Sequence, residues 1–332
     1  MDAKNDKAAR AEAWRQTLLA QAEQSGFFED IGPLHKAIYI PATGPKADTL
    51  VVVFDNLDDT RQKTDRLPWA VDFISAQGWS SLGLMAHGAT WYRDPAVWAF
   101  FEQLKKDGFF ALFRRVVFYG TSMGGYAACA FSAAAPGATV LAINPQSTLS
   151  RSEASWERRF RPAWRNDFSG PYGFAPDMIG AAEKVWMFYD SRIAADAAHV
   201  ALFRGPQVEK VKCPFMGHGM LSVWRDMGIL KPIVSACIEG HADRLGIARL
   251  LRARHSSLTY KKLVLQSLQK AGKHAKVVAW SDAVMREKKG PVFVKARQAA
   301  LEALPPRKRA ALAQRRIEQR RIERARIEQA PK

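Results

Sequence analysis

The chain has 332 residues, and 48% of them are hydrophobic, a fraction that excludes a wholly disordered protein. Its three cysteines are too few and too scattered for a disulfide framework or a zinc site. The first residues, MDAKNDKAARAEAW, lack the apolar core of a signal peptide. No run of residues reaches the ~20 apolar positions that a membrane-spanning helix needs. Together these features predict a cytoplasmic protein.

The formal charge of +18 is concentrated at one end of the chain. Residues 1–240 contain 26 Lys and Arg against 25 Asp and Glu, whereas residues 241–332 contain 24 against 7. Such asymmetry indicates that the basic part binds a polyanion, which could be a nucleic acid, an anionic membrane surface or an acidic partner. Binding to a membrane surface would make the protein peripheral to the membrane. A solvated basic helix face explains the charge equally well.

The elements predicted along the chain alternate between strands and helices. Residues 5–25 form an amphipathic helix that ends at Gly26. Strands are then expected at 37–41, 50–54, 81–85, 116–119, 138–143, 184–189 and 208–215. Helices are expected at 67–77, 94–106, 123–135, 194–204 and 219–237. Several of the strands are apolar throughout, as strands covered on both faces are. The alternation predicts an α/β fold with a mostly parallel sheet and helices on both faces.

Four segments follow from these patterns and from the charge. Residues 1–30 hold the first helix, and 31–240 form the α/β body. Within the body, residues 147–180 are too long for an ordinary connection and are predicted to be an insertion or lid. Residues 241–305 read as a basic helical hairpin around Gly272. After Pro305-Pro306, residues 306–332 read as a charged tail, helical or disordered.

The strongest chemical signal is Gly120-Thr121-Ser122-Met123-Gly124-Gly125, a G-x-S-x-G pattern. An apolar strand runs directly into it, and a helix of small residues follows it. This is the strand–turn–helix context of a nucleophile elbow, in which a serine hydroxyl projects from the carboxyl end of a sheet. The helix amino terminus there offers backbone N–H groups to a developing oxyanion.

A serine needs a base and an orienting acid to become a good nucleophile. The predicted strand 184–189 is followed by Asp190, and the run 208–216 is followed by Gly217-His218-Gly219. The order Ser122, Asp190, His218 is that of the α/β-hydrolases. Residues 37–238, about two-thirds of the chain, therefore resemble the α/β-hydrolase superfamily, and GTSMGGYAA looks like its serine-hydrolase elbow.

The resemblance implies a role for each of these residues. Ser122 would attack a carbonyl carbon, His218 would remove the serine proton, and Asp190 would hold the imidazolium. The backbone N–H of Met123 would form half of the oxyanion hole. The other half would come from the loop after the strand 50–54, which departs from the His-Gly pattern common there, so that Asn56 and Leu57 are both candidates.

Alternatives stay open at two places. Asp196, six residues after Asp190, competes for the role of the acid, although a cap on its helix or a pair with His199 would also explain it. The chain as a whole is either a serine hydrolase acting on a carboxylic ester or thioester, or a hydrolase-like scaffold without turnover that docks through its tail. No nucleotide-binding, redox or metal-ligand motif is present, so no cofactor is predicted.

Overall fold

The computed structural model describes residues 2–22, 26–61, 66–287 and 290–314, together with residues 318 and 321. The chain divides into two compact units. The first comprises Met1–Leu221 and Leu230–Leu250, and the second comprises Ser222–Ile229 and Leu251–Lys332.

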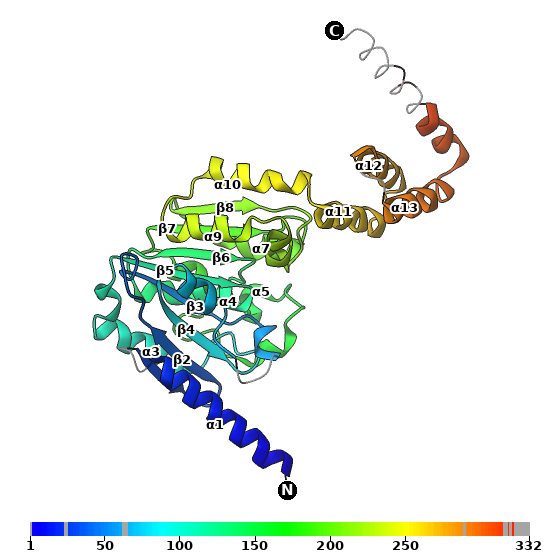
Figure 1. Cartoon of the computed structure of the whole chain (residues 1–332). Coiled ribbons are helices and arrows are strands. Elements are labelled where there is room, and N and C mark those ends of the chain that lie inside the picture. The colour runs from blue at the N-terminus through cyan, green and yellow to red at the C-terminus, as the bar shows by residue number, and fades with distance from the viewer. Residues whose placement is uncertain are drawn as a thin grey trace. The chain divides into compact units, whose positions relative to one another are not determined.

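An eight-stranded sheet with the order β1-β2-β4-β3-β5-β6-β7-β8 forms the centre of the first unit (Figure 1). Strands β3 to β8 are parallel to one another, and β1 and β2 join antiparallel at one edge. The mostly parallel sheet predicted from the sequence is therefore confirmed. The strands are β1 (Phe27–Ile31), β2 (His35–Ile40), β3 (Thr49–Phe54), β4 (Ser80–Ala86), β5 (Arg115–Thr121), β6 (Thr139–Ile143), β7 (Lys184–Tyr189) and β8 (Val208–Lys212).

Helices pack along the sheet through apolar faces. Helix α4, which is buried over its whole length, contacts β3, β5 and β6, while α7 contacts β7 and α9 contacts β6. Helix α1 contacts β1 and β2. The helices of this part of the chain are α1 (Asp2–Ala22), α2 (Val71–Ala76), α3 (Pro95–Lys106), α4 (Met123–Phe131), α5 (Arg151–Ala154), α6 (Ala175–Met178), α7 (Ala194–Leu202), α8 (Met220–Asp226), α9 (Leu230–Ile238) and α10 (Arg244–Leu251).

Stacked aromatic rings fill the space between the sheet and α4. Phe54 of β3 stacks with Phe118 of β5 and Phe131 of α4, and Phe101 of α3 stacks on Phe131 at 4.4 Å between ring centroids. All four rings are fully buried. Such close packing fixes the carboxyl ends of β3 and β5 relative to the start of α4.

One strand of the structure was not predicted, and two predicted elements end or divide differently. Strand β1 was not predicted because only its last residue, Ile31, is buried, which leaves a weak hydrophobic pattern. Strand β8 ends at Lys212 and gives way to a turn through Phe215, which adopts a positive φ of 67°. The helix predicted at 219–237 is two helices, α8 and α9, because Gly228 takes a left-handed conformation with φ of 69° between them.

The second unit includes most of α8 together with the helices α11 (Leu258–Lys270), α12 (His274–Glu287) and α13 (Pro291–Glu302). The apolar faces of the last three form a separate core that includes Leu265, Val278 and Phe293. The segment 241–305, predicted as a hairpin, thus contributes most of α10 to the first unit and a third helix, α13, to the second. The tail predicted at 306–332 is helical as far as residue 314, and most of the remainder lies outside the described residues.

Candidate active site

Ser122 occupies a tight turn between the end of β5 and the start of α4. Its φ of 54° and ψ of −119° lie in a region that residues other than glycine rarely adopt. The turn closes only because Gly120 and Gly124 have no Cβ. A Cβ on Gly120 would lie 2.1 Å from the carbonyl oxygen of Gly124, and one on Gly124 would lie 2.5 Å from that of Phe54. This is the geometry that the G-x-S-x-G pattern predicts.

The hydroxyl of Ser122 lies next to the imidazole of His218. Nε2 of His218 is 2.9 Å from Oγ of Ser122, and its Nδ1 is 2.9 Å from Oδ2 of Asp196. With the proton on Nδ1, the ring donates to the carboxylate and accepts from the serine hydroxyl. Asp196 is 1% exposed, whereas the imidazole is 30% exposed. The three groups form a continuous chain of hydrogen bonds that runs from the serine hydroxyl through a partly exposed imidazole to a buried carboxylate.

The prediction that Asp190 holds this imidazole is wrong for the geometry seen here. Asp190 follows β7, but its carboxylate accepts the backbone N–H groups of Gly217 at 2.8 Å and Arg192 at 2.9 Å. The turn after β7 then folds the chain back, with Ile193 N–H bonded to the carbonyl oxygen of Asp190. This turn directs the first turn of α7, and with it Asp196, toward His218. The alternative that the sequence left open is the observed partner.

Two side chains hold the loop that carries His218. Asp190 accepts from the residue before it, as described above. Asn144, directly after β6, donates from Nδ2 to the carbonyl oxygen of His218 at 2.5 Å. Asn144 is fully buried and adopts a positive φ of 46°. The sequence analysis did not identify Asn144 as a site residue, although its position directly after a predicted strand places it at the same end of the sheet as Ser122.

The backbone N–H groups predicted to form an oxyanion hole lie at the start of α4 and in the loop after β3. Met123 begins α4, where the first N–H groups of a helix have no partner within it. In the loop after β3, the N–H of Asn56 is occupied, because it donates to Oδ2 of Asp59 at 2.9 Å. Leu57 is the next residue of this loop, and the end of β3 lies against Gly124 of the elbow. Of the two predicted donors, Leu57 therefore fits an oxyanion hole better than Asn56.

A second set of polar groups, buried except for Arg159, continues from Asp196 into the insertion segment 147–180. Nη1 of Arg159 lies 2.7 Å from Oδ1 of Asp196, and Nη2 of the same guanidinium lies 2.5 Å from Oε2 of Glu157. Glu157 also lies 3.2 Å from Nε2 of His199, whose Nδ1 accepts the backbone N–H of Ser147. The pairing of Asp196 with His199 that the sequence left open is not among the described hydrogen bonds, in which His199 contacts Ser147 and Glu157 instead.

The ionisation of this set follows from its hydrogen bonds. Burial acts to raise the pKa of Glu157, but bonds from His199 and Arg159 outweigh it and lower this pKa to about 2. Burial lowers the pKa of His199, against the opposing effect of Glu157. The pKa of Arg159 is raised because its two carboxylate partners outweigh its burial. At neutral pH the set thus contains an ionised glutamate, a charged arginine and a neutral histidine.

Aromatic rings of the insertion segment and of the loop after β4 flank the site. The ring of Phe160 lies 6.3 Å from the imidazole of His218 and 5.1 Å from the ring of Trp91. Phe160 is half-buried, whereas Trp91 is 1% exposed and hydrogen bonds to Gln146. Phe160 is therefore the ring best placed to meet a group bound at Ser122. Trp91, in the loop after β4, packs against the ring of Phe160.

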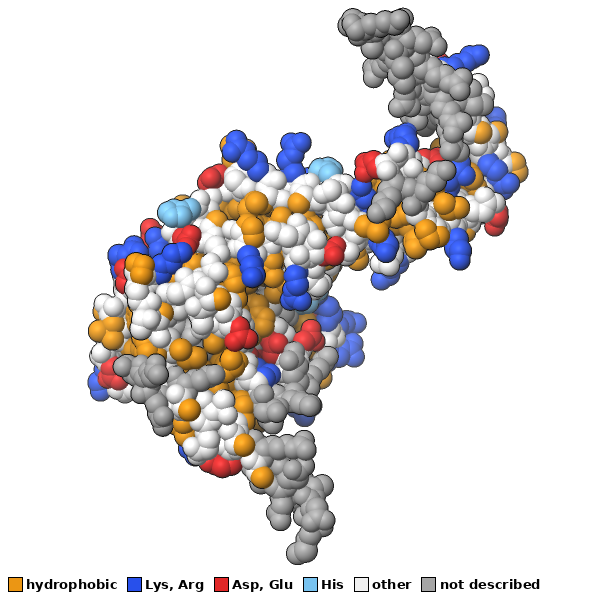
Figure 2. Space-filling model, in the orientation of Figure 1, with side chains coloured by type: hydrophobic (Ala, Val, Ile, Leu, Met, Phe, Trp, Pro, Cys, Tyr) orange, Lys and Arg blue, Asp and Glu red, His pale blue; other side chains and the backbone are white. Residues whose placement is uncertain are grey.

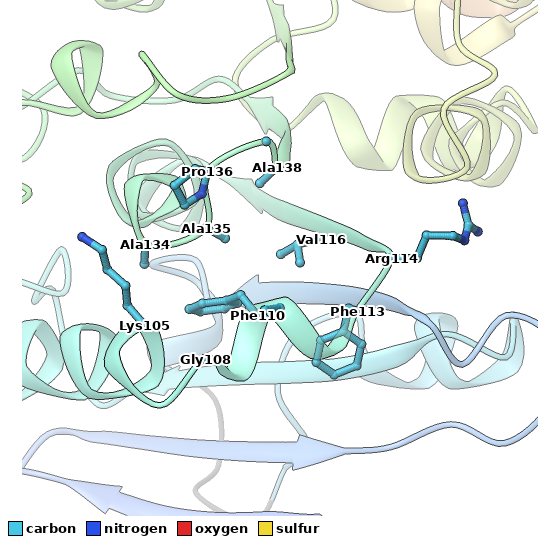
Figure 3. Close-up of a pocket in the computed structure, with 12 residues that line it drawn as sticks. Lys105, Gly108, Phe110, Phe113, Arg114, Val116, Ala134, Ala135, Pro136 and Ala138 are labelled. Atoms are coloured by element: carbon cyan, nitrogen blue, oxygen red, sulfur yellow. The ribbon is translucent and has the colours of Figure 1, made fainter.

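A distinct cavity of about 320 Å³ lies away from these residues (Figure 3). Val116 at the start of β5, Ala138 just before β6 and the ring of Phe110 line it. It lies at the amino ends of these parallel strands, whereas Ser122 follows the carboxyl end of β5. This cavity therefore lies at the opposite end of the strands from Ser122, His218 and Asp196.

Comparison with known proteins gives only distant structural similarity. No protein-family model and no curated protein sequence matches the chain. It is similar to the capsule O-acetyltransferase of Neisseria meningitidis serogroup A, with 10% identity, a TM-score of 0.43 and coverage of 63% of this chain and 93% of that one. An esterase of Pyrococcus furiosus gives 15% identity, a TM-score of 0.40 and coverage of 65% and 93%. An S-formylglutathione hydrolase from Agrobacterium tumefaciens gives 14% identity, a TM-score of 0.40 and coverage of 64% of this chain and 94% of that one.

The fold is α/β, with a mostly parallel eight-stranded sheet and a serine at the turn after β5. In the described part of the chain, no group of three or more His, Cys, Asp or Glu residues is arranged to hold a metal ion. None of the helices described is both long and apolar enough to cross a membrane.

Proposed function

We propose that the protein is a serine hydrolase that cleaves a carboxylic ester or thioester through an acyl-serine intermediate. The observation that carries this proposal is the chain of contacts from Ser122 to His218 to Asp196, with both distances at 2.9 Å and the serine in a strained turn. A structural serine has no need of a strained backbone that points its hydroxyl at a partly exposed imidazole.

In the first half of the reaction, Oγ of Ser122 bonds to the substrate carbonyl carbon as its proton moves to Nε2 of His218. The carbonyl oxygen becomes an oxyanion between the N–H groups of Met123 and Leu57. The imidazolium then gives its proton to the leaving alcohol or thiol as the carbon–leaving-group bond breaks. Throughout, the Asp196 carboxylate stabilises the imidazolium without taking its proton.

In the second half, a water molecule replaces the leaving group. His218 removes a proton from this water, and its oxygen bonds to the acyl carbon. The bond to Oγ of Ser122 then breaks as His218 returns a proton to that oxygen. The acid product leaves, and the enzyme is restored.

A fluorophosphonate probe tests the nucleophile directly, because Oγ attacks the phosphorus and displaces fluoride. We expect a single covalent adduct, and mass spectrometry of the digested protein should locate it on the peptide that contains Ser122. Heat-denatured protein is the control and should remain unlabelled, since labelling requires the assembled site. Absence of an adduct on well-folded protein would favour the alternative, a hydrolase-like scaffold without turnover.

We also propose that the second unit and the tail bind a polyanion. Residues 251–312 contain 15 Lys and Arg against three Asp and Glu. Two of these acids lie in ion pairs, Asp282 with Arg297 and Glu287 with Lys261. The side chains of Arg297 and Lys261 are mostly buried, so these pairs leave the exposed Lys and Arg side chains of the unit unneutralised. Lys and Arg side chains are spread over these helices in Figure 2. The exposed ones include Arg252, Lys262, Lys270, Lys273, Lys276, Arg286, Lys295, Arg307, Lys308 and Arg309.

Salt dependence tests this second proposal. We expect the protein to bind heparin and to elute at a lower salt concentration after Arg307 and Lys308 are both changed to Gln, because each phosphate or sulfate contact that is lost releases about one fewer counterion. Changing the exposed Lys105 and Lys106 of α3 to Gln removes the same charge from the first unit. Equal effects of the two double variants would mean that net charge alone, rather than a surface of the second unit, governs retention.

A further inference from the structure

Asp196 differs from an isolated triad acid, because a cation contacts its second oxygen. Oδ2 of Asp196 lies against Nδ1 of His218, while Oδ1 lies 2.7 Å from Nη1 of Arg159. The carboxylate is 1% exposed and the Arg159 side chain is 33% exposed, so solvent reaches this ion pair only from the side of the guanidinium. Taken alone, Arg159 would cancel the negative charge that is needed to stabilise an imidazolium on His218.

Glu157 restores this charge from the other side of the guanidinium. Its Oε1 accepts the backbone N–H of Arg159 at 2.8 Å, and both of its oxygens lie within 3.0 Å of the guanidinium nitrogens. Glu157 is fully buried. His199 adds no charge, because its Nδ1 accepts the N–H of Ser147 and its Nε2 therefore donates to Glu157. The two carboxylates and one guanidinium sum to a single negative charge.

We propose that Glu157 and Arg159 are positioning residues that act through Asp196, with Arg159 fixing the carboxylate and Glu157 preserving the net negative charge that His218 faces. Both residues are supplied by the insertion segment, two positions apart, so any movement of this segment carries the opposite charges together. The inference rests on the proposed hydrolase function, but it can be measured without turnover.

Other charged or titratable groups also face the His218 loop. Asp190, after β7, binds the N–H of Gly217. Arg192 packs its guanidinium over the ring of Phe215, 4.3 Å from the ring centroid. Neither residue contacts Arg159 or Glu157 in the described hydrogen bonds, and both stay unchanged in the variants below. A change in the protonation of His218 in those variants therefore reports on Glu157 and Arg159.

The test is an NMR titration of the His218 imidazole in protein labelled with ¹⁵N-histidine, with the signal assigned from a His218→Gln sample. In Glu157→Gln, the titration midpoint should fall by on the order of one pH unit, because the imidazolium loses a nearby negative charge. In Arg159→Met it should rise by a similar amount. The double variant should titrate near the parent protein, and Arg159→Lys should lie between Arg159→Met and the parent.

Matched controls come from the same segment. Glu153 and Arg158 are exposed, so Glu153→Gln and Arg158→Met change the same charges at the surface and should move the midpoint little. Thermal unfolding would verify that each variant folds. Shifts of one sign in both single variants, or no shift in folded variants, would overturn the proposal and leave these residues with a structural role only.

Turnover separates this inference from the proposed function. The acidic limb of the kcat/KM profile on a p-nitrophenyl ester should follow the NMR midpoints in direction. If the opposite NMR shifts appear in a protein without esterase activity or probe labelling, the charge arrangement is established and the hydrolase function fails. If activity is present without the shifts, the function stands and this inference is wrong.

Discussion

Changing Ser122 to alanine is expected to reduce ester hydrolysis by at least about 10⁴-fold and to abolish fluorophosphonate labelling. Without Oγ, no acyl-enzyme can form, and His218 has only water to activate. The fold should persist, because the strained turn is closed by the glycines on either side and not by the serine hydroxyl. Initial rates on p-nitrophenyl esters of different chain length, with circular dichroism on the same samples, measure both effects.

Ser147 provides a matched control for this variant, because it too lies beside a histidine. Its Oγ is 2.9 Å from Nδ1 of His199, which in turn contacts Glu157, so the three residues imitate the order of a triad. All three side chains are fully buried and cannot meet a substrate. Ser147→Ala should therefore retain labelling at Ser122. Loss of labelling in Ser147→Ala but not in Ser122→Ala would mean that Ser147, and not Ser122, is the nucleophile.

The sheet and the tight turn at Ser122 could be predicted because their signals are local in the sequence. A run such as Leu50–Phe54 is apolar throughout only when both faces of its strand are covered. The turn at Ser122 needs small residues at fixed positions, and Gly120 and Gly124 meet that requirement directly. Strand β1, in contrast, lies at an edge with one buried residue, so its pattern is too weak to separate from a loop.

The identity of the acid could not be predicted from local signals. Both Asp190 and Asp196 follow the same strand, and the choice depends on how the turn between them aims the first turn of α7. The contacts of Arg159 and Glu157 were still harder to predict, because the insertion segment has little regular structure. The contact of Arg159 with Asp196 joins residues 37 positions apart. An ion pair between residues so far apart in the chain leaves no periodic pattern in the sequence.

Comparison of Asp196→Asn with Asp190→Asn separates the two acids by function. In Asp196→Asn, the amide cannot accept from Nδ1 and also stabilise the imidazolium as a carboxylate does, so the ring loses the tautomer that accepts the serine proton. We expect kcat to fall by about 10³- to 10⁴-fold. Arg159 would also lose a partner, which adds a cost in stability of about 1–3 kcal/mol.

Asp190→Asn should behave differently, because this side chain accepts two backbone N–H groups and does not contact the imidazole. An asparagine oxygen can keep one of these bonds, while its NH₂ group faces the other N–H. The expected result is a loss of about 1–2 kcal/mol in the free energy of unfolding and a fall in kcat of less than about tenfold, since the loop of His218 is still held by Asn144. Chemical denaturation and initial rates on one ester measure both quantities. A larger loss of kcat in Asp190→Asn than in Asp196→Asn would mean that the carboxylate beside Nδ1 in this structure is not the one that supports the imidazolium during reaction.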